Sequence, residues 1–375
     1  MTKPIKILFL TTGLNTGGAE MMLCKLLSRL DRKVFSPVVL SLKPGILMKR
    51  IEGFDVPVYV LQLKKFHSWK NILKALRQIR PDIIQGWMYH GNLFSYFLKS
   101  LFFPQSILLF GIRHTPSSDK KNKILTRAVI SLGAFFSKHT KCIIYASHQS
   151  NSYHKTIGYS SSQSITIPNG FDLELFQPGA ERRKTLRKLL FLEEEAFIIG
   201  CTARYHPIKG YDVFLEAAEI LKKKGYEQVH FVCLGRNVDW NNSFFLLSEK
   251  KLGLSRDYLH LLGEKENIQN FIAGFDLFTL SSYSEGFPNV LGEAMSCGVP
   301  CVATNAGDSS FIIGETGRVV SPGNPTELAK AWEYFIQMPP EKRITIGTQA
   351  RKRIEDNFTI DNVVKKYQDT YKKLI

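Results

Sequence analysis

The sequence lacks several features that would place it in a specialised class of protein. Its six cysteines, among 375 residues, form no paired C-x-x-C framework, and no histidine cluster has the spacing of metal ligands. We therefore expect buried, apolar cysteines, although Cys297 and Cys301 lie close in sequence. The longest nearly apolar stretch, residues 101–112, is interrupted by Pro104 and falls short of the roughly 18 residues of a spanning helix. The short apolar run at residues 7–10 is no secretion signal, so we expect a cytoplasmic protein.

Acidic residues are scarce in the first half of the chain. Residues 1–180 contain 24 Lys and Arg against 8 Asp and Glu, a net charge of +16, whereas residues 181–375 contain 26 against 25. A basic domain of this kind indicates a polyanionic partner, either nucleic acid or an anionic membrane surface, and a merely solvated basic surface is the alternative. We expect no nucleic acid, because the sequence contains no recognised nucleic-acid-binding module.

Short apolar runs rich in β-formers alternate with longer helical patterns, which predicts an α/β fold of two doubly wound parallel sheets. The aperiodic residues 171–183, with Pro178 and Gly179, are a plausible linker, and we place the domain boundary after residue 180. Ligands are expected in a cleft between the two facing domains, outside the carboxyl ends of the strands. The expected strands are residues 6–12, 37–42, 58–63, 82–87, 107–113, 142–147 and 164–170, and then 197–204, 229–235, 258–263, 276–282, 300–304 and 317–321.

The strongest local motif is EGFPNVLGEAMSCGVP, residues 285–300, directly after a predicted strand. Gly286 allows a tight turn, Pro288 suits a first helical turn, and Gly298 ends the helix. The amides at the start of this helix suit an anion or the hydroxyls of a polar ligand. The carboxylates of Glu285 and Glu293 bracket the turn and are suited to accept hydrogen bonds from sugar hydroxyls, although both could equally be ordinary helix charges.

This motif, in the form EGFPNVLGEAMSCGVPCVAT, resembles the Glu-x7-Glu signature of the retaining glycosyltransferase family 4, whose GT-B architecture has two facing Rossmann-like domains. The segments CTARYHPIKGYDVFLEAAEIL, IPNG, TNAGDSSFIIGETGRVVSPGNPTELAKA and TGLNTGGAE are similar to that family as well. The resemblance covers nearly the whole chain and is looser in the first half.

The resemblance implies roles for residues of the second domain, residues 181–357, as the donor-binding domain. Arg204 and Lys209 would neutralise the diphosphate of a nucleotide-sugar, a task that fixed cations perform by stabilising the charge on the leaving group. Glu293 would bind the ribose hydroxyls and Glu285 the transferred sugar. No Asp-x-Asp pair is present, so we expect neither a metal nor a cofactor beyond the nucleotide-sugar co-substrate. The residues expected to line the donor site around the turn are Gly286, Phe287, Pro288, Asn289 and Val290.

In the first domain, residues 1–180, Gly17 and Gly18 would let backbone amides approach the diphosphate or the acceptor. They depart from the G-x-G-x-x-G dinucleotide fingerprint, which disfavours a nicotinamide enzyme. His114 resembles the active-site histidine of the family, and His90 and Arg113 are further candidates for acceptor or sugar contact. The family reacts on one face of the sugar, and no protein nucleophile is expected.

The sequence therefore predicts a metal-independent retaining glycosyltransferase that transfers a sugar to a glycan acceptor, lipid-linked, in bacterial surface polysaccharide synthesis at the inner face of the cytoplasmic membrane. The segment 120–141 places apolar residues on one side, as in an interfacial helix or an ordinary core helix. The terminal helix, residues 358–375, is expected to cross back to the first domain, as in enzymes of this type. The alternatives are a GT-B phosphorylase, a synthase of soluble glycosides, or a non-catalytic protein that binds polyanions or membranes.

Overall fold

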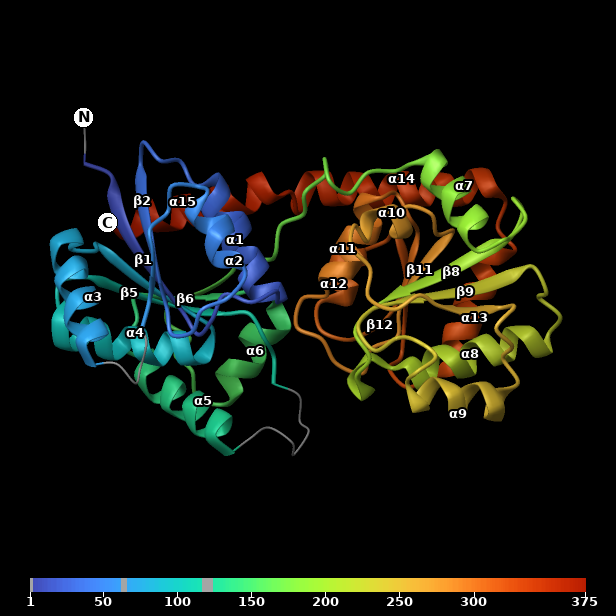
Figure 1. Cartoon of the computed structure of the whole chain (residues 1–375), viewed down its shortest axis with the longest axis horizontal. Helices are drawn as coiled ribbons and strands as arrows, with labels where there is room; N and C mark the ends of the chain where they lie inside the picture. Colours follow the sequence, from blue (N-terminus) through green and yellow to red (C-terminus); the bar gives the residue numbers. More distant parts are fainter. Residues whose placement is uncertain (1–2, 62–65, 117–123) are drawn as a thin grey trace. The chain divides into compact units, whose positions relative to one another are not determined.

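The computed structural model describes residues 3–61, 66–116 and 124–375. The chain divides into two compact units, one of Met1–Gly170 with Ile360–Ile375 and one of Phe171–Thr359 (Figure 1). The boundary that we placed after residue 180 lies ten residues later than this division. Residues 171–180 belong to the second unit because Phe171 and Phe176 are buried in its core. Part of the expected linker is also helical, since α7 (Ala180–Leu189) begins within it.

The sheet of the first unit has seven parallel strands in the order β3-β2-β1-β4-β5-β6-β7. All seven predicted strands are confirmed. Six of them end one to four residues before the predicted limit, where the chain turns into loops, and the fourth ends at residue 87 as predicted. The predicted end of the third strand, residues 62–63, lies outside the described residues. The strands are β1 (Ile5–Thr11), β2 (Phe35–Ser41), β3 (Val58–Val60), β4 (Ile83–Trp87), β5 (Ile107–Ile112), β6 (Cys142–Tyr145) and β7 (Ser164–Thr166).

Helices cover both faces of this sheet. One core layer packs α1, α2 and α15 on the sheet, and the opposite layer packs α3, α4 and α5. The predicted helix at residues 120–141 is confirmed as α5, and residues 120–123 lie outside the described residues. The helices are α1 (Gly18–Arg29), α2 (Leu47–Glu52), α3 (Phe66–Ile79), α4 (Met88–Phe102), α5 (Ile124–Ser137), α6 (His148–Thr156) and α15 (Ile360–Leu374).

The terminal helix α15 packs in the first unit. Its Tyr367 and Tyr371 are fully buried among aromatic residues of that unit, with the Tyr371 ring 5.9 Å from the Phe35 ring. The Tyr371 hydroxyl donates a hydrogen bond of 2.5 Å to Gln85 in the middle of β4. The last helix is therefore part of the core of the first unit.

The second unit repeats the same architecture with six parallel strands in the order β10-β9-β8-β11-β12-β13. All six predicted strands are confirmed, and so is the helix predicted between Pro288 and Gly298. The strands are β8 (Phe197–Thr202), β9 (Val229–Leu234), β10 (Leu259–Leu261), β11 (Leu277–Leu280), β12 (Cys301–Thr304) and β13 (Gly317–Val320). The helices besides α7 are α8 (Tyr211–Lys223), α9 (Ser243–Leu252), α10 (Gln269–Ile272), α11 (Asn289–Ser296), α12 (Ser309–Ile313), α13 (Pro325–Ile336) and α14 (Pro340–Asn357).

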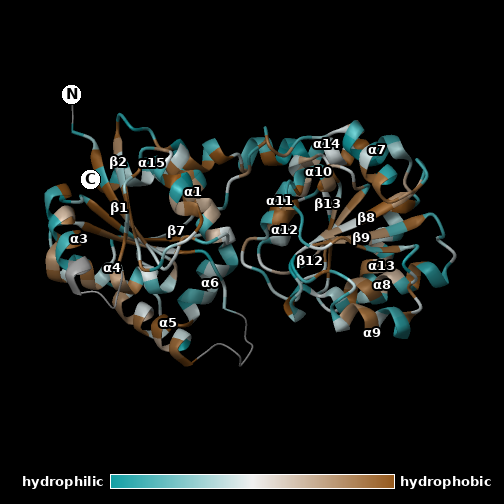
Figure 2. Ribbon diagram, in the orientation of Figure 1, coloured by the Kyte–Doolittle hydropathy of each residue, from teal (hydrophilic) through white to brown (hydrophobic). Residues whose placement is uncertain are grey.

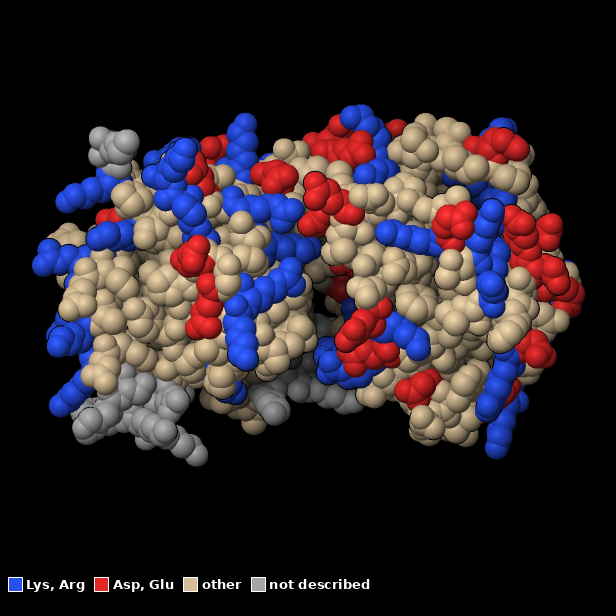
Figure 3. Space-filling model, turned by 45° about the horizontal axis from the view of Figure 1, so that its top comes forward, with Lys and Arg blue, Asp and Glu red and all other residues tan. Residues whose placement is uncertain are grey.

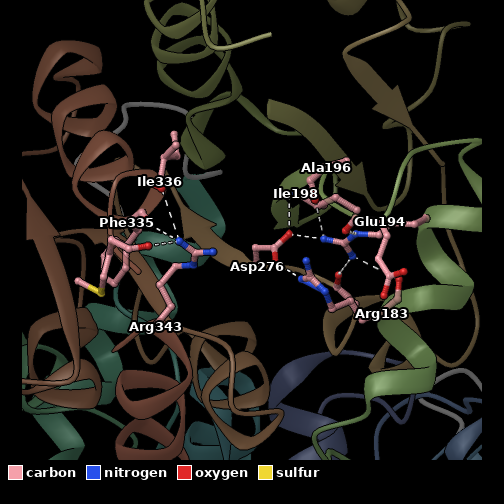
Figure 4. Close-up of polar contacts among 11 residues, drawn as sticks. Arg183, Glu194, Ala196, Ile198, Asp276, Phe335, Ile336 and Arg343 are labelled. Atoms are coloured by element: carbon pink, nitrogen blue, oxygen red, sulfur yellow. Dashed lines mark hydrogen bonds and ion pairs between the residues drawn. The ribbon is translucent and has the colours of Figure 1, made fainter. Parts of the chain in front are cut away.

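A buried ion pair fastens α7 to the sheet of the second unit (Figure 4). Asp276, just before β11, accepts hydrogen bonds from Arg187 at 2.5 Å, from the amide of Ile198 at 2.7 Å, and from Arg183. The Arg187 side chain is 3% exposed and also donates to four backbone carbonyl oxygens, those of Arg183, Glu194, Ala196 and Gly274. All five donors of this guanidinium are thus used.

The two units differ sharply in charge. The first contains 28 Lys and Arg against 8 Asp and Glu, a net charge of +20, and the second 22 against 25, a net charge of −3. Figure 3 shows basic side chains spread over the first unit with few acidic ones, whereas both signs alternate over the second. The positive charge of the chain therefore belongs to the first unit.

The remaining expectations from composition concern cysteine and membrane spans. All six cysteines are buried and free, as predicted, and burial raises the pKa of Cys142 to about 11 and that of Cys297 to about 12. Among the described residues, no helix is long and apolar enough to cross a membrane.

Candidate functional site

The strand orders locate the position in each sheet where a ligand is expected to bind. In both sheets the order reverses direction at one point, between β1 and β4 in the first unit and between β8 and β11 in the second. Ligands of doubly wound sheets bind outside the carboxyl ends of the strands at such a switch point. The loops after β8 and β11, and those after β1 and β4, are therefore the candidate sites of the two units.

In the second unit, the loops after β8 and β11 are fastened to one another. Lys209 lies in a short 3-10 turn after β8, and its carbonyl oxygen accepts a hydrogen bond of 3.0 Å from the Ser281 hydroxyl after β11. Gly210 has a left-handed backbone with φ of 66°, and a Cβ there would collide with the carbonyl of Ser281. Only glycine allows this close approach of the two loops.

This fastening brings Lys209 and Glu285 into contact. The Lys209 Nζ lies 2.7 Å from Glu285 Oε1, and the Ser282 hydroxyl donates to the same oxygen at 2.6 Å. The side chains of Lys209 and Glu285 are 23% and 12% exposed, so the pair is largely shielded from water. A cation and a carboxylate that are 76 residues apart in sequence thus form one polar centre at the switch point.

The turn after Glu285 leads into α11 and exposes the start of that helix. Pro288 is the N-cap residue, one position before the helical turn in which we expected it. Phe287 is buried and stacks against Phe171 at 6.1 Å, and the carbonyl of Gly286 accepts a hydrogen bond from the Asp308 amide. These contacts fix the turn that precedes α11.

The other expected donor residues lie around this centre. Asn289 and Val290 begin α11, and Glu293 lies one turn further along the same helix, half-buried. Arg204 is exposed, two residues beyond the end of β8. The structure thus places Arg204, Lys209 and Glu285 in the two loops of the switch point and Glu293 on the adjoining helix.

Two residues at this centre were not predicted from the sequence. Ser282 binds Glu285, and Thr202, the last residue of β8, has a buried hydroxyl with no hydrogen-bond partner among the described residues. Both are small hydroxyl residues at or just beyond a strand end. That position was the available signal, since strand ends at a switch point face the ligand.

In the first unit, Gly17 and Gly18 start α1 after β1. Gly17 is the N-cap of α1, and a side chain on it would collide with the carboxylate of Glu20 in the first turn of that helix. Burial raises the pKa of Glu20. The Glu20 carboxylate thus lies beside the start of α1, where we expected backbone amides to approach the diphosphate or the acceptor.

The neighbouring strands place the two candidate histidines. His90 lies in the first turn of α4, directly after β4, and is half-buried. His114 is exposed, two residues after β5, which pairs with β4. Both therefore lie at the same edge of the sheet.

A buried network holds the main chain of His114. Its carbonyl oxygen lies 3.0 Å from the Tyr89 hydroxyl and 3.2 Å from the Ser150 hydroxyl. The Tyr89 hydroxyl also lies 2.9 Å from His154 Nε2, and His154 Nδ1 lies 2.7 Å from the Ser150 carbonyl. Burial lowers the pKa of His154 to about 4, so this ring is neutral, with its proton on Nδ1 facing the carbonyl. The loops after β4, β5 and β6 are thereby linked.

Arg113 has hydrogen-bond partners within the first unit that the sequence did not indicate. Its guanidinium donates to the Tyr367 hydroxyl at 2.6 Å and to Asn169, and it stacks 4.8 Å from the Trp87 ring. These contacts join the Arg113 side chain to α15 and to Asn169, at the end of the first segment of the unit. Its expected contact with the acceptor or the sugar stays a prediction.

Within residues 3–61, 66–116 and 124–375, no group of three or more His, Cys, Asp or Glu side chains is arranged to hold a metal ion.

Comparison with solved structures defines the class of fold. The chain matches *Anabaena* HepE, solved in complex with UDP, with a TM-score of 0.85 and 21% sequence identity over 98% of this chain and 100% of that chain. It matches sucrose-phosphate synthase from *Thermosynechococcus elongatus* with a TM-score of 0.78 and 18% identity over 99% of both chains. The two parallel α/β sheets thus have the GT-B architecture.

The sequence comparisons then identify the family. Residues 16–175 match Glycosyltransferase Family 4, and residues 196–338 match Glycosyl transferases group 1. The chain therefore contains a glycosyltransferase family 4 domain followed by a group 1 glycosyltransferase domain, in agreement with the resemblance noted in the sequence.

The relatives include bacterial glycosyltransferases that are named for capsule and lipopolysaccharide core synthesis. The *Staphylococcus aureus* capsular polysaccharide biosynthesis glycosyltransferase CapH is 24% identical over 313 residues, 82% of this chain and 83% of CapH. The *Escherichia coli* UDP-Gal:alpha-D-GlcNAc-diphosphoundecaprenol alpha-1,3-galactosyltransferase is 28% identical over 209 residues, 55% of this chain and 53% of the relative. The match therefore spans about half the length of the *E. coli* protein.

Proposed function

We propose that this protein transfers a sugar from a nucleoside-diphosphate sugar to a glycan acceptor, with retention at the anomeric carbon and without a metal ion. The observation that carries the proposal is the polar centre at the switch point of the second unit. There Lys209 contacts Glu285, and Arg204 lies in the same loop after β8 as Lys209. Cations and a carboxylate in one shielded place suit a ligand that combines a diphosphate with a sugar.

The reaction breaks the bond between the anomeric carbon and the diphosphate oxygen, on which negative charge accumulates. In our proposal Lys209 and Arg204 stabilise that charge, a task that a metal ion performs in other transferases. Glu285 accepts hydrogen bonds from hydroxyls of the transferred sugar, and Glu293 binds the ribose. The acceptor hydroxyl forms the new bond to the anomeric carbon, and its proton passes to the departing diphosphate. His114 contacts the donor sugar near the reacting carbon.

The first unit would bind the acceptor, which we propose is lipid-linked and belongs to bacterial surface polysaccharide synthesis. The *E. coli* relative is named for a diphosphoundecaprenol acceptor, and CapH for capsule synthesis. The net charge of +20 on the first unit suits the anionic inner face of the cytoplasmic membrane, where such acceptors would be met.

A second candidate is a synthase of soluble glycosides. The structural similarity to sucrose-phosphate synthase favours it, as does a *Bacillus anthracis* N-acetyl-alpha-D-glucosaminyl L-malate synthase that is 33% identical over 119 residues. The two candidates share the donor chemistry and differ in the acceptor. A labelled product that partitions into an organic phase would support the lipid-linked acceptor, and one that stays in water would support the synthase.

The proposal is tested first by thermal shift with UDP, GDP, ADP and CMP, each with and without EDTA. A ligand at about 100 times its dissociation constant adds roughly 2.7 kcal/mol to the free energy of unfolding. We expect one diphosphate to raise the melting temperature equally in EDTA, with the effect reduced in Lys209→Met. UDP is the first candidate because HepE was solved with UDP and UDP-glucose. Stabilisation that vanishes in EDTA would contradict a metal-free site, and no stabilisation at all would favour a non-catalytic polyanion-binding protein.

A further inference from the structure

The helix α5 has an apolar surface on the side that faces solvent. Its opposite side is buried in the core of the first unit through Val129, Ile130 and Ala134. Arg127 and Ser131 are also exposed on this helix, but large apolar side chains grouped on a solvent-facing side are typical of an interaction surface, and α5 has such a side. Four large side chains project from it, namely Ile124 (88% exposed), Leu125 (71%), Leu132 (46%) and Phe135 (59%).

The neighbouring helix α4 extends this surface. Phe97 and Leu101, one turn apart on α4, are 43% and 70% exposed. Phe97 contacts Phe136 of α5 at 5.5 Å, and Tyr96 stacks on the same ring at 4.1 Å, so an aromatic seam joins the two helices. Figure 2 shows the apolar colouring of α5. We call Phe97, Leu101, Ile124, Leu125, Leu132 and Phe135 the α4–α5 face.

Basic residues surround the α4–α5 face, and acidic residues are almost absent near it in sequence. Residues 66–116 and 124–170 contain ten Lys and Arg and one acidic residue, Asp82. Arg127 is exposed on α5, and Lys138, directly after the end of α5, lies with its Nζ 4.4 Å above the Phe135 ring. Lys70, Lys74 and Arg77 are exposed on α3, which packs in the same layer, and Arg80 is exposed directly after its end.

We propose that the α4–α5 face docks on an anionic lipid bilayer, with its apolar side chains among the acyl chains and the surrounding cations at the headgroups. Apolar side chains flanked by Lys and Arg, with no fixed acceptor geometry, suit a fluid anionic surface. A second copy of the chain is disfavoured as the occupant, because pairing this face with itself would oppose like charges on a unit of net charge +20. This inference rests on the membrane-bound acceptor of the proposed function and names the surface that reaches it.

The test is co-sedimentation of the full chain with vesicles of mixed phosphatidylglycerol and phosphatidylcholine, and with vesicles of phosphatidylcholine alone. The test variant combines Leu125→Ser, Leu132→Ser and Phe135→Ser. The matched control combines Phe191→Ser, Leu247→Ser and Ile344→Ser, three apolar residues of the second unit that are 67–96% exposed. Circular dichroism and the nucleotide thermal shift show that each variant is folded.

We expect binding to anionic vesicles alone, weakened at least about tenfold in the test variant and unchanged in the control. Replacing Lys74 and Arg77 by Gln should weaken binding by about fivefold per charge at low salt. The proposal is overturned if anionic vesicles are not bound, or if the control weakens binding as much as the test variant. It is also overturned if the protein is a dimer by light scattering that the test variant converts to a monomer without any vesicle binding. The proposed function fails separately, through the nucleotide shift, so the two results are distinguishable.

Discussion

The buried ion pair of Asp276 and Arg187 gives a stability prediction that can be tested without knowing the substrate. We consider Asp276→Asn, which keeps the shape of the side chain and removes its charge. The Asp276 and Arg187 side chains are only 6% and 3% exposed, so the substitution leaves the Arg187 cation in the interior without a counterion. Arg187 retains its four carbonyl acceptors, which prevents complete loss of its hydrogen bonds.

The size of the effect follows from this arrangement. Breaking a buried pair by removing one partner costs about 3–5 kcal/mol, and the retained carbonyl contacts place Asp276→Asn near about 3 kcal/mol. For a unit of about 190 residues, this lowers the melting temperature by about 6–12 °C. Arg183 contacts the same carboxylate, but its side chain is 39% exposed, so Arg183→Met should cost less than about 1 kcal/mol.

Differential scanning calorimetry of the full chain, with the transition of the second unit identified by its shift on nucleotide binding, measures both variants. The double variant Asp276→Asn with Arg187→Met should be less destabilised than the sum of the two single changes, because the buried cation is then absent. The reasoning is refuted if Asp276→Asn and Arg183→Met have equal effects, since burial would then not decide the cost. Additivity in the double variant would refute it as well.

Three further predictions concern the candidate sites. Lys209→Met should lower kcat for sugar transfer by about 10²- to 10³-fold at saturating donor, because one fixed cation at the leaving group is lost. Lys209→Arg keeps the positive charge and should keep part of the rate. Equal rates for the two variants would contradict the proposed role of Lys209. The free energy of unfolding should fall as the pH drops from 6.5 toward 4, because over that range His154 takes up a proton only in the unfolded chain. The pKa of His154 is about 4 in the folded protein and about 6.5 in the unfolded chain, which gives a loss of about 2 kcal/mol at pH 5. In urea titrations at pH 7 and pH 5, His154→Gln should lose this component, and an unchanged pH dependence would contradict it. Tyr89→Phe removes the hydroxyl that lies between the His114 carbonyl and His154 Nε2, and it should lower kcat about tenfold with KM nearly unchanged. If Tyr89→Phe lowers kcat while His114→Ala has no effect on kcat, the network does not act through His114 and is structural only.

The architecture was predictable because it depends on local patterns. Buried parallel strands read as short continuous apolar runs, and each of the thirteen predicted runs is a strand. Pro288 and Gly298 mark the ends of α11 because they act through their own backbone. The domain boundary was less accurate, because the packing of Phe171 and Phe176 in the second unit depends on partners distant in sequence.

The candidate site was predictable as a set of residues and not as a set of contacts. The motif indicated Glu285 and Lys209 separately, but their ion pair requires Gly210 to bring two loops together. Arg113 is a second example. Its position after a strand suggested a ligand contact, but not its hydrogen bond to the hydroxyl of Tyr367 in α15, more than 200 residues later. No local pattern contains that information.

The charges of the two units indicate how their tasks are divided. The second unit has a net charge of −3, and only two of its cations, Arg204 and Lys209, are proposed to bind the diphosphate. Lys209 is shielded from water and paired with Glu285. In the first unit the charge of +20 is spread over exposed side chains, and salt screens exposed charges much more than shielded ones. Moderate salt should therefore weaken attachment to an anionic membrane while donor binding persists. In a transferase built in this way, a few shielded residues of the second unit would bind the donor. The exposed charge of the first unit would bring the enzyme to the membrane surface that holds its acceptor.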